Sequence, residues 1–244
     1  SYITGAYATY VGKEIGKFYG WVYEGIARTQ SDLDNHATQQ GANVGDCLYK
    51  DISGPNGEPD GVIDAYDQTV LGSGLAKMNF GLSAHMEYKG FDLSISTYGA
   101  LNYHVADDIY NSLNSCYGWG NKDVAMADAN RFSEDGSTYL SNVPRTYVDN
   151  KGTLAWNDLF SSRKIQNAAY WKIANVELGY NFPDRWFKGL VTGVRAYVSA
   201  QNLYTFTGYK GYNVDYAGGT FTPGFNFCSF PSARSFMAGL HFTF

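Results

Sequence analysis

The chain has 244 residues, of which 17% are charged and 17% aromatic. The charged fraction lies below the roughly 25% that is usual in soluble domains. The 21 tyrosines and 28 glycines favour twisted strands over helices. The 18 basic and 23 acidic residues give a formal net charge of −5, and no basic cluster points to nucleic acid as a partner.

A transmembrane helix is excluded because the sequence holds no run of about 18 apolar residues, the length that such a helix needs. A membrane β-barrel stays open, since its apolar residues only alternate with polar ones. The chain starts at Ser1 without a signal peptide, so we expect a processed chain or a fragment of a longer one.

The first 26 residues predict a pair of strands. Tyr2–Val11 is expected to descend to a turn near Gly12–Gly16, and Phe18–Tyr23 to rise again. A rising strand leaves Ala27–Lys77 as a long connection on the outer side, where the later long connections also lie.

Within this connection, one segment has the oxygen spacing of a calcium loop. Side-chain oxygens fall at loop positions one, three, five, nine and twelve, with glycine at six; the residues are Asn56, Glu58, Asp60, Asp64 and Asp67, with Gly61. Asparagine in place of the first acid and a short aspartate in place of the last glutamate weaken the match. An acidic turn closed by Asx hydrogen bonds is the alternative.

Period-two alternation then predicts the main strands. In Asn79–Tyr88 the apolar residues Phe80 and Leu82 begin a row that alternates with small or polar ones, and Phe91–Ser96 repeats the pattern after Lys89-Gly90. Three later runs alternate in the same way: Ala174–Phe182, Val194–Gln201 and Phe236–Phe244. Such runs approach the roughly 9–11 residues with which a tilted strand crosses a bilayer.

Loop lengths and aromatic residues favour a membrane barrel. The connections Lys89-Gly90 and Pro183–Gly189 are short, whereas Ala27–Lys77, Ala100–Ala168 and Phe206–Arg234 are long. Short and long connections alternate in outer-membrane barrels. Aromatic residues gather at both ends of the strands: Tyr180, Phe182, Trp186 and Phe187 at one end, and Tyr204, Phe206 and Tyr209 at the other. In all, we expect six to seven strands.

The connection Ala100–Ala168 is rich in aromatic residues. If exposed, they would stack on sugars or hold peptides, and the substrate-binding residues would be Tyr103, Tyr117, Trp119 and Trp156. The alternative is that these rings pack the loops against one another, since large loops need a core of their own.

Catalytic motifs are absent from the sequence. The four histidines have no zinc-protease spacing, and neither a Gly-x-Ser-x-Gly elbow nor a phosphate-binding loop occurs. We therefore expect a protein that is not an enzyme.

Several stretches together resemble the C-terminal part of SusC/RagA-type TonB-dependent outer-membrane transporters. Each stretch alone is a weak signal, but their order and spacing along nearly the whole chain are specific. They are Gly16–Gly20, Gly25-Ile26, Tyr49–Asp51, Asp60–Asp64 with Asp67, Tyr88–Ser94, Leu178–Asn181, Gln201–Leu203 and Gly239–Phe244.

This resemblance implies an all-β fold: the last strands of a plugged, antiparallel transmembrane barrel of 22 strands, with long extracellular loops. The plug, the segment that contacts TonB and the earlier strands would lie upstream of Ser1, and the remainder of the barrel would complete the wall. Glu177, Arg195 and Gln201 would line the lumen and face the plug. The resemblance further implies residence in the outer membrane of a Bacteroidetes-type Gram-negative cell, import of oligosaccharides or peptides, and a SusD-like lipoprotein above the loops.

A soluble, lectin-like β-sandwich that binds glycans is the alternative function. Apolar and polar residues alternate along the strands of such a sandwich in the same way. The sandwich, however, requires the apolar residues Phe80, Leu82, Val176 and Leu178 to be buried by protein.

Overall fold

The computed structural model describes residues 2–114, 121–124, 131–146, 156–187, 191–215, 218–227 and 229–244. The candidate residues Tyr117 and Trp119 lie outside these ranges. The chain forms two compact units. Unit 1 comprises Ser1–Leu75, His104–Gln166 and Ala217–Cys228, and unit 2 comprises Ala76–Tyr103, Asn167–Tyr216 and Ser229–Phe244.

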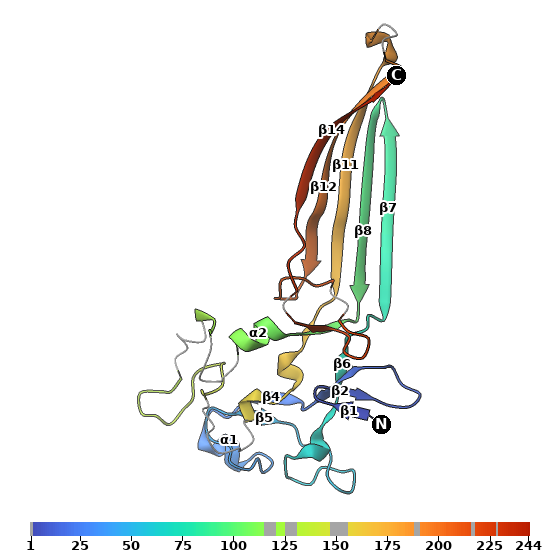
Figure 1. Cartoon of the computed structure of the whole chain (residues 1–244). Helices are drawn as coiled ribbons and strands as arrows, with labels where there is room; N and C mark the ends of the chain where they lie inside the picture. The colour runs from blue at the N-terminus through green and yellow to red at the C-terminus, as the bar shows by residue number, and fades with distance from the viewer. Residues whose placement is uncertain are drawn as a thin grey trace. The chain divides into compact units, whose positions relative to one another are not determined.

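Unit 2 is a single antiparallel sheet of five long strands in the order β14-β12-β11-β8-β7, which Figure 1 shows side by side. The strands are β7 (Met78–Tyr88), β8 (Phe91–Leu101), β11 (Tyr170–Phe182), β12 (Gly193–Thr207) and β14 (Ser235–Thr243). A short 3-10 helix η4 (Asp184–Trp186) lies between β11 and β12. The sheet confirms the strands that the alternation predicts.

The turn between β7 and β8 is the one that the sequence predicts. Tyr88 pairs with Phe91, and the two turn residues have positive φ angles of 48° at Lys89 and 90° at Gly90. A two-residue hairpin needs this backbone, and glycine adopts it without strain. The local sequence thus sets the register of the hairpin.

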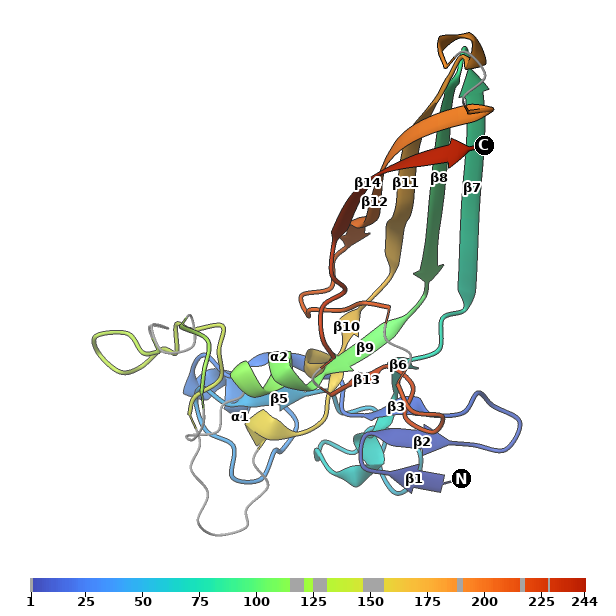
Figure 2. The ribbon, with the colours of Figure 1, turned by 45° about the horizontal axis from the view of Figure 1, so that its top comes forward.

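The first strand pair differs from the prediction. Residues 2–26 form four short strands: β1 (Tyr2–Thr4), β2 (Tyr7–Thr9), β3 (Lys17–Gly20) and β4 (Tyr23–Ile26). They belong to unit 1, where β1, β2, β3 and β6 (Thr69–Ser73) form a sheet of their own. Figure 2 shows β1, β2 and β3 side by side. Among the described residues, five strands reach nine residues or more, and the other strands are short.

The rest of unit 1 is built from short elements. The strands are β5 (Cys47–Tyr49), which pairs with β4, and β9 (His104–Asp107), which lies between β10 (Gln166–Asn167) and β13 (Phe225–Asn226). The helices are α1 (Gln30–Asp34), α2 (Asp108–Leu113) and the 3-10 turns η1 (Ala65–Asp67), η2 (Trp156–Asp158) and η3 (Ser162–Lys164). Among the described residues, none of the helices is both long and apolar enough to span a membrane.

Unit 1 has two hydrophobic clusters of its own. One gathers Cys47, Tyr49, Ile63 and Trp156, and the other gathers Tyr7, Phe18 and Ala106. Phe18 is fully buried because its ring lies 5.1 Å from Tyr7 and 5.9 Å from Phe160. The sequence assigns these residues to a strand pair and to two long connections, and in the structure they pack together in two clusters.

Candidate functional site

The sheet of unit 2 has one polar and one apolar face. On the polar face, Arg195 of β12 joins three strands: its Nε donates to Asp92 Oδ1 of β8 at 3.0 Å, and its Nη2 donates to Glu177 Oε1 of β11 at 2.7 Å. Asn181 Nδ2 donates to the same Asp92 oxygen at 3.1 Å. The predicted inward residues Glu177 and Arg195 thus meet, whereas Gln201 is exposed farther along β12.

Glycine makes room for this cluster. A Cβ atom on Gly179 would lie 2.6 Å from Asp92 Oδ1 and would also overlap the Arg195 guanidinium. Gly179 pairs with Asp92 on β8 and with Tyr197 on β12. The Arg195 side chain therefore crosses the sheet directly above Gly179. The absence of a side chain there lets one cation reach carboxylates on two other strands.

The apolar face carries two rows of aromatic residues. Pairing aligns Phe80, Trp171 and Phe206 at the end with the long connections, and Tyr88, Phe91 and Tyr180 at the end with the tight turns. On β7 the rows are eight positions apart, or about 26 Å at roughly 3.3 Å per residue. This is close to the roughly 25 Å apolar band of outer-membrane barrels.

The aromatic residues predicted at the strand ends fall into two groups. Phe182 contacts both Tyr180 and Trp186 at the turn end, and Tyr204 lies 4.7 Å from Phe206 at the other end. Tyr209 is instead buried, with 7% of its surface exposed, and Trp171, which the sequence analysis missed, stacks on Phe206.

The apolar side chains of this face are left exposed by the residues that the structure describes. Leu82 is 66% exposed and Leu178 is 44% exposed, while Phe80 and Val176 are partly exposed. Within unit 2 the described residues form no second sheet that packs on this face. The lectin-like sandwich requires all four residues to be buried, so the structure contradicts that alternative.

A second polar cluster lies at the end with the long connections. Lys172 of β11, with 5% of its side chain exposed, donates to Asp215 Oδ2 at 2.8 Å, and Tyr98 Oη of β8 donates to the same oxygen at 2.8 Å. Burial opposes ionisation of Asp215, but hydrogen bonds from Lys172 and Tyr98 outweigh it and hold the pKa of this carboxyl below its usual range. The segment after β12 is thereby fixed onto the polar face.

Sequence reasoning missed this cluster because of an irregularity in β11. Continuing the alternation from Val176 back to Lys172 would place the lysine on the apolar face. The pairing shifts register between Ile173 and Asn175, so Lys172 lies opposite Tyr98 and shares the polar face with Asn175. A lysine in the middle of an apolar row was the signal in the sequence that a bulge lies there.

Lys172 and Asp215 of this cluster also line a cavity of about 320 Å³. Its lining includes Lys172, Asp215, Asn202, Tyr212, Asn213 and Arg234, and all its lining residues belong to unit 2.

Of the predicted substrate-binding residues, Tyr103 and Trp156 are described and both are buried, each with 6% of its surface exposed. Trp156 donates from Nε1 to the carbonyl oxygen of Gln40 at 2.9 Å and lies 6.2 Å from the Tyr49 ring. Neither residue offers an exposed aromatic face to a ligand. At these two positions the geometry favours the packing interpretation.

The predicted calcium segment uses its carboxylates to bind main-chain N–H groups. Asp60 accepts from Val62 at 3.0 Å and Asp64 accepts from Tyr66 at 2.7 Å, as in Asx turns. The buried Asp67 accepts from Ile52, Ser53 and Asp64, while Asn56 and Glu58 are exposed.

The acidic residues of this segment do not converge. In the described part of the chain, no three His, Cys, Asp or Glu side chains are grouped so that they could hold a metal ion. The observed hydrogen bonds match the Asx alternative, and calcium binding stays a prediction.

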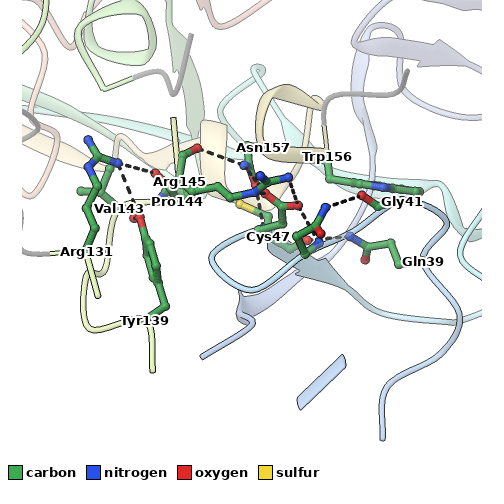
Figure 3. Close-up of polar contacts among 12 residues, drawn as sticks. Gln39, Gly41, Cys47, Arg131, Tyr139, Val143, Pro144, Arg145, Trp156 and Asn157 are labelled. Atoms are coloured by element: carbon green, nitrogen blue, oxygen red, sulfur yellow. Dashed lines mark hydrogen bonds and ion pairs between the residues drawn. The ribbon is translucent and has the colours of Figure 1, made fainter. Parts of the chain in front are cut away.

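A polar clamp in unit 1 joins segments that are distant in the sequence (Figure 3). Arg145 donates from Nη2 to Asp46 Oδ2 at 2.9 Å, and Asn157 donates from Nδ2 to Asp46 Oδ1 at 2.7 Å. Asn157 Oδ1 in turn accepts from the Cys47 N–H at 2.7 Å. Residues 131–146 are therefore fixed to β5 and to η2.

The relatives of the chain are transport proteins. TonB-dependent receptor P3 of Formosa agariphila is 30% identical over an alignment of 243 residues that covers 96% of this chain and 22% of that protein. TonB-dependent receptor SusC of Bacteroides thetaiotaomicron is 27% identical over an alignment of 211 residues that covers 81% of this chain and 19% of that protein. The chain is homologous to TonB-dependent receptors of the SusC/RagA type. It spans about a fifth of the length of these relatives.

Solved structures agree in fold. The structure of the RagAB peptide transporter matches 94% of this chain and 23% of its own chain, with a TM-score of 0.70 and 21% identity. The RagAB peptide importer in the "open-open" state matches with a TM-score of 0.67 and 20% identity. No family model matches the chain. The homology is to TonB-dependent receptors, in agreement with the expectation that the chain is not an enzyme.

Proposed function

We propose that residues 1–244 are the C-terminal part of a TonB-dependent importer of oligosaccharides or peptides in the outer membrane of a Bacteroidetes-type cell. The plug, the TonB-contacting segment and the earlier strands would precede residue 1, and together they would close a barrel of 22 strands. A SusD-like lipoprotein would cover the long connections. The homology and the two-faced sheet support this proposal.

The observation that carries the proposal is the exposed apolar face between two aromatic rows. In water, so much apolar surface on one sheet would favour aggregation, whereas lipid chains cover it without cost. The opposite face carries Arg195, Asp92 and Glu177, which a water-filled lumen or a plug solvates. Open edges at β7 and β14 then pair with the remainder of the barrel.

Two neighbouring residues of β7 test the assignment of the faces. Leu82 and Ser83 lie at the same depth on opposite faces, near the middle of the strand. We expect Leu82→Arg to destabilise the full-length receptor in lipid by about 2–4 kcal/mol, because arginine then faces hydrocarbon. Ser83→Arg is the matched control and is expected to change stability little.

The measurement is folding of the full-length receptor into lipid vesicles at increasing urea concentration. Similar destabilisation by both substitutions would contradict a lipid-facing apolar row. Import is tested separately: a labelled oligosaccharide or peptide is expected to enter cells only when both the receptor and TonB are present. Equal uptake without TonB would contradict energised import.

A further inference from the structure

The cavity of about 320 Å³ at the long-connection end of unit 2 has an excess of positive charge. Lys172 is neutralised by Asp215 at 2.8 Å. Arg234 also lines the cavity, is exposed, and forms no ion pair with any residue that the structure describes. The cavity thus holds one guanidinium whose charge is not balanced by a neighbour.

The arginine is carried by a segment that is held in place. Asn202, at a positive φ of 51° in β12, donates from Nδ2 to the carbonyl oxygen of Ala233 at 2.8 Å. The contact fixes the residue immediately before Arg234, next to the last strand of the sheet. The guanidinium is therefore presented from an anchored main chain, which lowers the entropy lost when a ligand binds.

An exposed tyrosine is also part of the lining. Tyr212 is 64% exposed, and Asn202 and Asn213 add amide groups. An arginine and an exposed aromatic ring in the same lining suit a planar anion attached to a ring or a peptide group, since guanidinium pairs bidentately with carboxylate. A phosphate or sulfate would place more than one negative charge against this single unbalanced cation.

We propose that this cavity binds the carboxylate of the imported molecule: Arg234 pairs with the carboxylate, and Tyr212 packs on the adjoining group. The carboxylate belongs to an acidic sugar or to the C-terminus of a peptide. This inference rests on the proposed function, because it names the chemical feature by which an imported oligosaccharide or peptide is held. The cavity volume is large enough for one sugar ring or one terminal residue, and the remainder of the molecule extends into the lumen.

The test is calorimetric titration of the full-length receptor in detergent with two pairs of probes. Trigalacturonate is compared with galactotriose, and trialanine with trialanine amide. In each pair only the first molecule carries carboxylate groups. We expect one acidic probe to bind at least tenfold more tightly than its neutral counterpart, and that pair identifies the source of the carboxylate. Equal affinity within both pairs, or binding of none of the four, would overturn the proposal.

Substitutions assign the binding to this cavity. Arg234→Gln is expected to reduce the affinity for the acidic probe at least tenfold and to abolish its dependence on salt concentration. Tyr212→Ala is also expected to reduce the affinity for the acidic probe. Arg185→Gln removes an exposed arginine at the opposite end of the sheet and is expected to have no effect. Unchanged affinity in Arg234→Gln would contradict the inference even if the acidic probe binds.

The carboxylate site and the proposed function can fail independently of each other. The Leu82 and Ser83 substitutions lie away from the cavity, and they test placement in the membrane whether or not a ligand binds. A receptor that passes those tests and imports substrate, yet binds acidic and neutral probes equally, keeps the proposed function and loses only the carboxylate site.

Discussion

Arg145→Met is expected to destabilise unit 1 by about 3 kcal/mol, because it leaves the Asp46 carboxylate buried without its cation. The Asp46 side chain is 4% exposed and the Arg145 side chain 31% exposed. The value lies at the low end of the range for broken buried pairs, since Asp46 keeps hydrogen bonds from Asn43 and Asn157. Residues 131–146 lose their side-chain ion pair to Asp46 and keep main-chain hydrogen bonds to Gly45 and Arg28, and we also expect faster proteolysis within them.

Limited proteolysis and thermal unfolding of the full-length receptor measure this effect. Lys17→Met is the matched control: its Nζ lies 3.4 Å from Glu14 Oε2, and both side chains are about a quarter exposed, at 25% and 28%. Such a pair is worth roughly 0–1 kcal/mol. If both variants were cleaved at the same rate, the clamp would not hold residues 131–146.

Arg195→Met is expected to destabilise the sheet of unit 2 by about 3–5 kcal/mol, since it removes the cation between Asp92 and Glu177. The Asp92 side chain is only 7% exposed, so its carboxylate would remain buried beside that of Glu177. The three strands β8, β11 and β12 meet at this arginine, and the loss should lower the urea concentration at which the receptor unfolds from vesicles.

A second substitution separates charge from packing. The double variant Arg195→Met with Asp92→Asn removes the buried charge together with its partner, and we expect it to recover much of the lost stability. Arg185→Met, at an exposed position of the turn, serves as the control. If the double variant were no more stable than Arg195→Met, the uncompensated carboxylate would not be the cause.

The strands and the tight turn were predictable because their signals are local. Alternation from Phe80 to Tyr88 separates the two faces of β7, and Lys89-Gly90 supplies the positive φ angles of a two-residue hairpin. The polar face was also predictable in part, since Glu177 and Arg195 have the parity of that face. Alternation could not show the register shift near Ala174, and Lys172 was therefore missed.

The candidate site residues in the long connections were less predictable. Trp156 has the same composition signal whether it is exposed to a ligand or packed on Tyr49, and only the packed arrangement is observed. The carboxylates of Asp60, Asp64 and Asp67 have calcium-loop spacing, yet they accept main-chain hydrogen bonds. The spacing shows which carboxylate oxygens are close in the sequence. It does not show whether main-chain N–H groups or a metal ion bind those oxygens.

The sequence by itself determined the two faces of the strands, the tight hairpin and the resemblance to SusC/RagA-type receptors. The first two depend on neighbouring residues, and the third depends on the order of short motifs along the chain. The tertiary structure decided how the long connections pack. Asp46 and Arg145 are 99 positions apart, and Asp46 and Asn157 are 111 apart, yet they form one clamp. Bringing residues so far apart in the sequence into contact requires a core with matching shape and charge. The alternation of apolar and polar residues along one strand carries no information about that match.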